Sequence, residues 1–179
     1  MRFIHDYGQE CDWCAFLDID EFLFSPYKYD LRRVLKFYKT APAVCVNWIM
    51  YGTSNVDKIP ENEKIAKFLT HRAKLNFKGN FQVKSIVQPS LVEKCTSPHF
   101  FIFKNGLHAI TENMNPIRGF MSESVSVNTF RINHYWTRDK YYFLNHKIKR
   151  RLKWGCNAQE DIENEKELNE VYDPVIAFE

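Results

Sequence analysis

The sequence predicts an α/β domain in which helices flank a sheet. Two apolar runs have strand length, Trp13–Leu17 and Ala43–Met50, and runs of this kind are typical of strands buried on both faces. Between them, Asp30 precedes apolar residues at helical spacing, which predicts a helix over 31–38 with Asp30 as its N-cap. At 179 residues the chain has the size of one domain with one substantial core.

The rest of the chain continues this alternation. Residues 53–64 are polar and include Pro60, so a loop is expected there. The tail after Gly155 is acidic. The other expected elements are strands at Phe81–Val87, His99–Phe103 and Val125–Tyr135, a turn-rich loop at Asn113–Gly119, and a basic helix with Tyr141, Leu144, Ile148 and Leu152 on one face.

Composition and charge exclude several classes of protein. The net charge is +3, too small to indicate nucleic-acid binding, and the basic segment 138–153 is followed by an acidic one at 160–170. A basic helix beside aromatic residues keeps nucleic-acid binding as the weakest hypothesis, since it leaves the acidic cluster described next unexplained. No apolar stretch approaches the roughly 20 residues of a membrane span. The five irregularly spaced cysteines and the absence of an apolar leader favour a cytoplasmic setting.

Three carboxylates lie within four residues, Asp18, Asp20 and Glu21, directly after the first apolar run. Like charges at this density raise one another's pKa unless a cation neutralises them. In an extended chain Asp18 and Asp20 would share one side, and such hard oxygen ligands suit Mg²⁺ or Mn²⁺. The alternative is a surface turn with solvated acids. The apolar Phe22–Phe24 segment that follows favours the metal site.

Four motifs resemble one family of enzymes. The run Trp13-x-x-Phe16-Leu17-Asp18-Ile19-Asp20-Glu21-Phe22 resembles the Asp-x-Asp signature of glycosyltransferases with the GT-A fold, above all those of glycosyltransferase family 92 and related family 2-like enzymes. The other three motifs follow in the same order over most of the chain from Trp13 to Lys153. They are Asn47–Ser54, which is similar to a Trp-x-x-Phe-Gly segment, Lys84–Pro89 followed by His99, and Ile132–Tyr135 leading into Phe143 and Lys147.

The resemblance implies a fold and an activity. The fold would be a GT-A-like mixed sheet with flanking helices, truncated at the N-terminus, because the signature begins at residue 18 and the nucleotide-binding half normally precedes it. Residues 1–155 would form the catalytic and acceptor-side domain, and 156–179 the acidic tail. The reaction would be metal-dependent transfer of a sugar from a nucleotide-sugar donor to a glycan, glycoconjugate or other hydroxyl acceptor. The alternative is a non-catalytic carbohydrate-binding remnant of such an enzyme.

The resemblance also implies the metal ligands. Asp20 would be the principal ligand of Mn²⁺ or Mg²⁺, and Asp18 would face the ribose of the donor or share the metal. His134 resembles the C-terminal histidine that supplies a further ligand in many GT-A enzymes, and a neutral imidazole is a sound ligand for Mn²⁺. The alternative for His134 is a buried structural histidine.

Two further roles follow from the needs of the reaction. Lys147 and Arg151 are candidates for holding the donor diphosphate, because a leaving group with developing charge needs cationic help. An inverting transferase also needs a carboxylate base near the acceptor hydroxyl. Asp161 and Glu160 are the candidates near the C-terminus, and Glu112 is another. Solvated acids on a surface are the alternative for all three.

Overall fold

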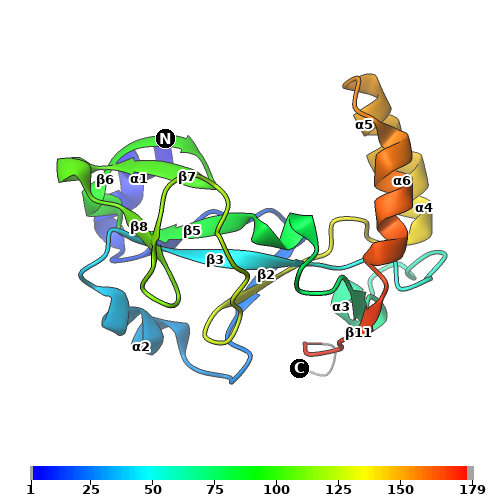
Figure 1. The fold of residues 1–179 in the computed structure, drawn as a ribbon, viewed down its shortest axis with the longest axis horizontal. Coiled ribbons are helices and arrows are strands. Elements are labelled where there is room, and N and C mark those ends of the chain that lie inside the picture. The colour runs from blue at the N-terminus through cyan, green and yellow to red at the C-terminus, as the bar shows by residue number, and fades with distance from the viewer. Residues whose placement is uncertain (1, 177–179) are drawn as a thin grey trace. The chain divides into compact units, whose positions relative to one another are not determined.

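The computed structural model describes residues 2–176, which form two compact units. The first unit contains the chain up to Trp48 together with Lys78–Ile132, and the second contains Ile49–Phe77 together with the chain from Asn133 onward. The predicted division into a domain at 1–155 and a tail at 156–179 stays a prediction. The predicted α/β class is confirmed, since a mixed sheet is accompanied by helices (Figure 1).

The main sheet has seven strands, with the order β1-β5-β3-β10-β2, and β8 and β9 extend it beside β3. The sheet is mixed because β3 pairs with β8 in parallel but with β5 antiparallel. Its strands are β1 (Cys14–Ala15), β2 (Glu21–Phe24), β3 (Ala43–Met50), β5 (Val83–Val87), β8 (Ala109–Thr111), β9 (Pro116–Ile117) and β10 (Arg131–His134).

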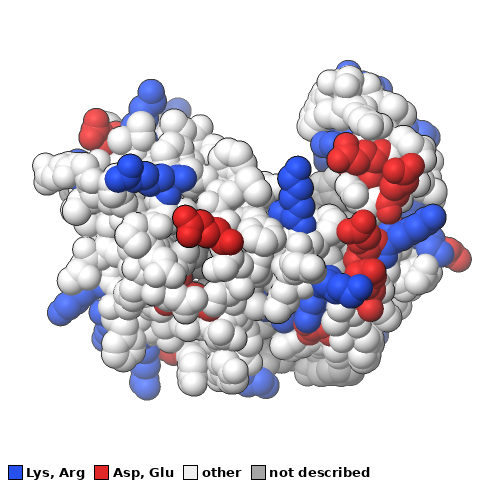
Figure 2. Space-filling view, viewed as in Figure 1, with Lys and Arg blue, Asp and Glu red and all other residues white. Residues whose placement is uncertain are grey.

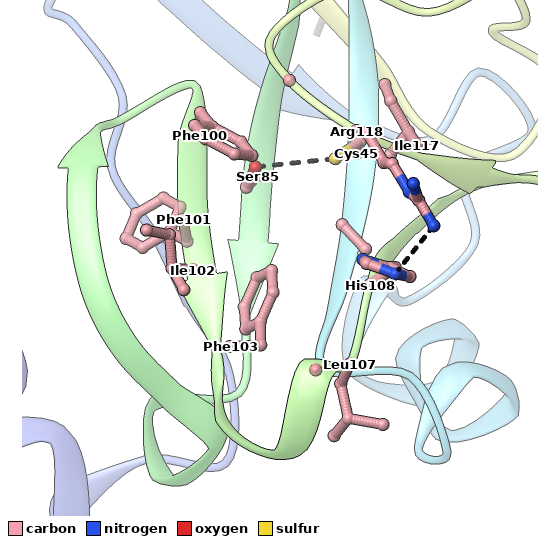
Figure 3. A pocket seen from close by; sticks show the side chains of 13 residues that line it. Cys45, Ser85, Phe100, Phe101, Ile102, Phe103, Leu107, His108, Ile117 and Arg118 are labelled. Atoms are coloured by element: carbon pink, nitrogen blue, oxygen red, sulfur yellow. Dashed lines mark hydrogen bonds between the residues drawn. The ribbon is translucent and has the colours of Figure 1, made fainter.

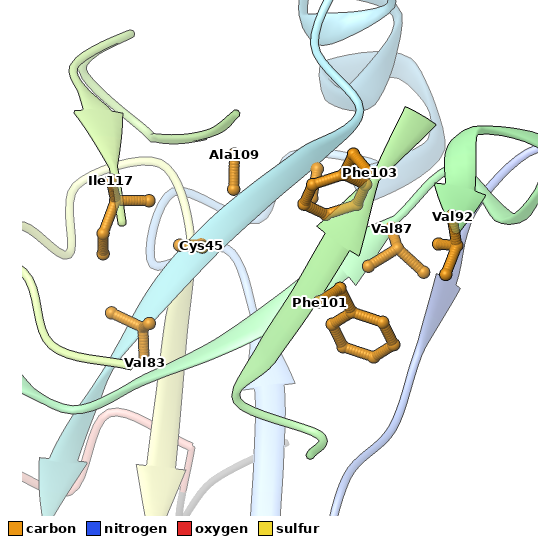
Figure 4. Packing of buried hydrophobic residues seen from close by; sticks show 9 residues of the cluster. Cys45, Val83, Val87, Val92, Phe101, Phe103, Ala109 and Ile117 are labelled. Carbon is orange, nitrogen blue, oxygen red and sulfur yellow. The ribbon is translucent and has the colours of Figure 1, made fainter. Parts of the chain in front are cut away.

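The core of the first unit lies on one face of β3 and β5. All eight residues of β3 are buried, which confirms the second predicted strand. Phe101 and Phe103 of β7 belong to one buried cluster with Cys45, Val83 and Val87 of the two strands, and both rings lie near Val87 (Figure 4). Because side chains alternate along a strand, the same strands direct Val46 and Lys84 to the opposite face.

The remaining elements of the first unit surround this sheet. Asp30 caps α2 as predicted, since its side chain accepts a hydrogen bond from the Arg32 amide. The β6–β7 hairpin is a separate two-stranded sheet, of which the sequence predicted only the second strand. These elements are α1 (Arg2–Tyr7), α2 (Leu31–Leu35), β6 (Val92–Ser97), β7 (Phe100–Phe103), and short 3₁₀ turns at Gly8–Glu10, Lys36–Tyr38, Lys78–Phe81, Pro89–Leu91 and Lys104–Gly106.

The regular secondary structure of the second unit is mainly helical. The predicted basic helix is present, but its central residues Phe143–Ile148 form a π-helical segment between α4 and α5. Phe143, Ile148 and Ala158 pack together, so α6 lies beside this long helix (Figure 1). The elements are α3 (Ile65–Phe68), α4 (Lys140–Tyr142), α5 (Lys149–Lys153), α6 (Ala158–Glu167), and the paired strands β4 (His71–Arg72) and β11 (Val171–Tyr172).

Two predicted strands are wrong in extent. The run Trp13–Leu17 was expected to be buried on both faces, but only Cys14–Ala15 is a strand, and Leu17 is 38% exposed. The reason is its place at an edge of the sheet, where β1 pairs with β5 alone. The expected strand Val125–Tyr135 is reduced to Arg131–His134, because a buried carboxylate holds the preceding loop in another conformation.

Candidate functional site

The acidic signature forms a tight turn rather than an extended segment. The Glu21 amide donates to the Asp18 carbonyl over 3.0 Å, and the Glu21 side chain accepts the Asp18 amide over 3.0 Å. This reciprocal pair corrects the expectation that Asp18 and Asp20 share one side of an extended chain. Ile19 is 96% exposed at the tip of the turn. The signature therefore presents its side chains from a turn immediately before β2.

The position of this turn follows from the sheet order. Strands β1 and β2 are consecutive in the chain but stand at opposite edges of the sheet. The connection between them, residues 16–20, must therefore cross the sheet. On β5, Lys84 is directed to the face opposite the Phe101 core. Its Nζ lies 3.1 Å from Asp18 Oδ2 and 3.2 Å from Glu21 Oε2.

The three charged side chains of this cluster differ greatly in exposure. The Lys84 side chain is 2% exposed and that of Glu21 is fully buried, whereas that of Asp18 is 65% exposed. Burial raises the pKa of Glu21, and its bond from the Asp18 amide and the charge of Lys84 oppose the shift. Glu21 Oε1 has no hydrogen-bond partner among the described residues. The pair Lys84–Glu21 thus forms a buried support beneath an exposed carboxylate.

Asp18 and Asp20 are the residues here that fit a divalent metal ion. Both offer hard carboxylate oxygens, and Asp18 uses only Oδ2 in its contact with Lys84. Within residues 2–176, no three His, Cys, Asp or Glu side chains come together as a ready-made metal cage. Mg²⁺ is usually held by one or two carboxylates together with substrate phosphates and water, so two carboxylates meet its ordinary requirement.

His99 and Trp48 lie in the same unit as the acidic turn. His99 Nδ1 donates to the Val83 carbonyl over 2.8 Å, and the two rings meet edge to face at 5.1 Å. Burial lowers the pKa of His99; its bond to Val83 and the charge of Asp18 oppose this shift, and the charge of Lys84 reinforces it. The sequence pattern predicts that a strand begins at His99, and β7 begins one residue later in the structure.

His134, Lys147 and Arg151 belong to the second unit. His134 is buried at the end of β10. Lys147 Nζ and the Arg151 guanidinium lie 5.1 Å and 6.0 Å from the centre of the Trp136 ring. Both cations therefore have a packing function on Trp136. Their predicted roles, with His134 as a metal ligand and the two cations on the diphosphate, stay predictions.

The two C-terminal carboxylates occupy different surroundings on α6. Asp161 is buried and forms an ion pair with Arg151, so its carboxylate is already engaged by the guanidinium. Glu160 is exposed in the first turn of the helix. Acidic side chains gather on the surface over α6 (Figure 2). Glu160 is therefore the more available of the two predicted bases.

Glu112 has a structural role, which argues against the third candidate for the base. Its carboxylate accepts the backbone amides of Asn128, Thr129 and Phe130, and the Ser126 hydroxyl donates to it as well. A carboxylate with four donors has no oxygen available for a proton of the acceptor. Glu112 instead anchors the loop before β10.

A cavity of about 330 Å³ lies on the same face of β3 and β5 as the Phe101 core, which is the face opposite Lys84 (Figure 3). Cys45 and Ser85 face it from the two strands, and His108 and Arg118 stand at its rim with 3.3 Å between their ring and guanidinium nitrogens. Burial raises the pKa of the Cys45 thiol to about 11, so this cysteine is not a nucleophile. Ser85 and Lys84 are adjacent in a strand and point to opposite faces, which separates the cavity from the acidic turn.

The mixed sheet and the carboxylate turn are compatible with a glycosyltransferase fold. The model of glycosyltransferase family 92 matches residues 4–171. The chain belongs to glycosyltransferase family 92. Among curated proteins, no sequence matches it. In the described part of the chain, none of the helices has the length and apolar character needed to span a membrane.

Sequence reasoning missed the functions of Lys84 and Glu21. Both stood inside recognised motifs, but neither was given a role. The available signal was the apolar setting of Lys84, which has Val83 before it and Ile86 and Val87 shortly after it. A lysine in a buried strand requires a carboxylate partner, but the sequence alone does not show which of the acidic residues supplies it.

Proposed function

We propose that this chain carries the metal-binding part of a glycosyltransferase site with a GT-A-like fold. The enzyme transfers a sugar from a nucleotide-sugar donor to a glycan or another hydroxyl acceptor. The observation that supports this most strongly is the exposed Asp18 carboxylate on a turn fixed from below by Lys84 and Glu21. The turn lies within the residues matched by the family model.

In this proposal Asp18 and Asp20 hold Mn²⁺ or Mg²⁺ together with the donor diphosphate. When bound, the metal ion supplies Lewis-acid stabilisation of the charge that develops on the departing diphosphate. Glu21 is buried and paired with Lys84, so it supports the turn rather than contacting the substrate. The roles of His134 as a further ligand and of Lys147 as a cation that assists with the diphosphate stay predictions from the family resemblance.

The proton acceptor is a carboxylate near the acceptor hydroxyl, and the three candidates differ in their contacts. Glu160 is exposed, while the Arg151 ion pair withdraws Asp161 and four donors occupy Glu112. We therefore assign the role of general base to Glu160. Because Glu160 is exposed to solvent, its carboxylate is accessible to a hydroxyl acceptor.

Calorimetric titration with Mn²⁺ tests the metal site directly. We expect Asp20→Ala to abolish binding and Asp18→Asn to weaken it less, because Asp20 is the principal ligand in this proposal. Asp12→Asn is the matched control, since Asp12 is an exposed acid near the turn and its loss should leave the affinity unchanged. An Asp20→Ala variant that binds Mn²⁺ as tightly as the unaltered chain would contradict the proposal.

Two further measurements extend the test from binding to function. His134→Ala should weaken Mn²⁺ binding by roughly 10- to 100-fold while the chain still folds. Release of nucleoside diphosphate from a mixture of sugar nucleotides, with Mn²⁺ present, measures turnover. Metal binding and carbohydrate binding without any such release would favour the non-catalytic carbohydrate-binding alternative.

A further inference from the structure

Lys84 is the one charged residue on β5, and its ammonium group lies out of water. Its side chain is 2% exposed, which is unusual for a lysine and requires compensation of its charge. Both nearby partners are carboxylates of the acidic turn, at 3.1 Å and 3.2 Å from Nζ. The strand thus places a fixed positive charge between a buried glutamate and an exposed aspartate.

We infer that Lys84 is a positioning residue for the metal site: it holds Asp18 Oδ2 and thereby orients Asp18 for metal binding through Oδ1. This inference rests on the proposed function, because it concerns the same carboxylate. Lys84 does not itself contact the metal or the substrate. Its effect passes through Asp18, whose backbone is already fixed by two hydrogen bonds to Glu21.

Glu21 explains why the cation stays in place. A lysine paired only with the exposed Asp18 would lose that partner to water easily, since exposed ion pairs contribute little. Glu21 Oε2 accepts the Asp18 amide and also contacts Lys84, so one buried oxygen fixes both the turn and the ammonium group. Glu21 therefore keeps the Lys84 ammonium group in position for its contact with Asp18.

An opposing effect makes the sign of the experiment informative. A cation next to a metal site repels the metal, so loss of Lys84 would tighten metal binding if charge were its only contribution. If Lys84 positions Asp18, its loss weakens metal binding instead, as does the loss of other groups that orient a ligand. The direction of the change separates the two roles.

The experiment measures Mn²⁺ affinity by calorimetry on the whole chain. Lys84→Met alone leaves Glu21 as an uncompensated buried acid, so the main variant combines Lys84→Met with Glu21→Gln, which keeps an oxygen for the Asp18 amide. We expect this double variant to bind Mn²⁺ roughly 10- to 100-fold more weakly. The single variant Lys84→Arg keeps the positive charge beside Asp18 and Glu21. It should bind Mn²⁺ more tightly than the double variant but less tightly than the unaltered chain. The exposed Lys94→Met is the control and should change nothing.

A second readout keeps the result independent of the metal. Hydrogen exchange at the Asp18 amide should be faster in the double variant than in Glu21→Gln alone, because only the double variant lacks the Lys84 contacts to Asp18 and to residue 21. Equal or tighter Mn²⁺ binding by the double variant overturns the inference and leaves the proposed function intact. If the unaltered chain binds no Mn²⁺, the proposed metal site fails, and unchanged exchange at Asp18 would then overturn the positioning role as well.

Discussion

Glu112 and Glu21 are both buried carboxylates of the first unit, but their oxygens have different partners. Glu112 accepts three successive backbone amides and one hydroxyl, all from the loop that leads into β10. Glu21 accepts one backbone amide and contacts one lysine, both through Oε2. Its Oε1 has no hydrogen-bond partner among the described residues.

The difference separates a carboxylate that fixes a loop from one that supports the candidate site. Every donor to Glu112 is uncharged, and its carboxylate oxygens fix a loop that lies outside the strands. Glu21 belongs instead to a cluster of three charges, and one of them, Asp18, is open to solvent. Buried charged groups that lack some of their hydrogen-bond partners are found preferentially at functional sites. That is why Glu21 marks the candidate site and Glu112 does not.

Removal of the Glu112 carboxylate should have the largest effect on stability. Glu112→Ala leaves three amides and a hydroxyl without their acceptor, and each buried donor left unsatisfied costs about 1–3 kcal/mol. Some of these donors are partly exposed, so we expect a loss of about 3 kcal/mol in the free energy of unfolding, measured by chemical denaturation.

The neighbouring acid Glu123 provides the control for this measurement. It is exposed in the same loop, so Glu123→Ala should leave the free energy of unfolding within about 0.5 kcal/mol of the unaltered chain. Mn²⁺ affinity should be the same in folded Glu112→Ala as in the unaltered chain. A selective loss of metal binding in that variant would mean that the two glutamates are not divided as we describe.

A smaller change tests the same loop one donor at a time. Ser126→Ala removes the hydroxyl from Glu112 but keeps its three amide donors. Because the carboxylate remains mostly satisfied, we expect a loss of about 1 kcal/mol by denaturation. The exposed Ser124→Ala in the same loop serves as the comparison. Equal effects of Ser126→Ala and Glu112→Ala would show that the hydroxyl alone carries the anchoring.

Sequence patterns predicted the strongly local features of this fold. The Asp30 cap and the apolar run of β3 depend on neighbouring residues, and both predictions are confirmed. The late start of β10, at Arg131, depends on Glu112, which is remote in the sequence, so alternation at 125–130 gave a wrong strand. Likewise, Trp13–Leu17 has the composition of a central strand, but its edge position follows from the order of the whole sheet.

The candidate site divides in the same way. The carboxylate pair and its family were visible in the sequence, and the family is confirmed. The turn at Asp18 and the support from Lys84 were not, because they depend on a strand more than sixty residues away. The roles of His134, Lys147, Glu160 and the metal, as well as the cytoplasmic setting, stay predictions. Their tests require ligands or cells rather than the fold.

The smallest expected effect is a pH dependence specific to Glu21. Burial raises its pKa above the ordinary value of 4.5, so the folded chain holds this proton more tightly than the unfolded chain. Stability must then fall as the pH rises from about 4.5 through the raised pKa, and it becomes level above both values. Glu21→Gln removes this ionisation. The free energy of unfolding of the variant, relative to that of the unaltered chain, should therefore increase across this window. Denaturation between pH 4 and pH 8 measures it, with the exposed Glu123→Gln as control. A difference that stays constant or decreases with pH would show that Lys84 and the Asp18 amide compensate fully for the burial of Glu21, which would make Glu21 as well satisfied as Glu112.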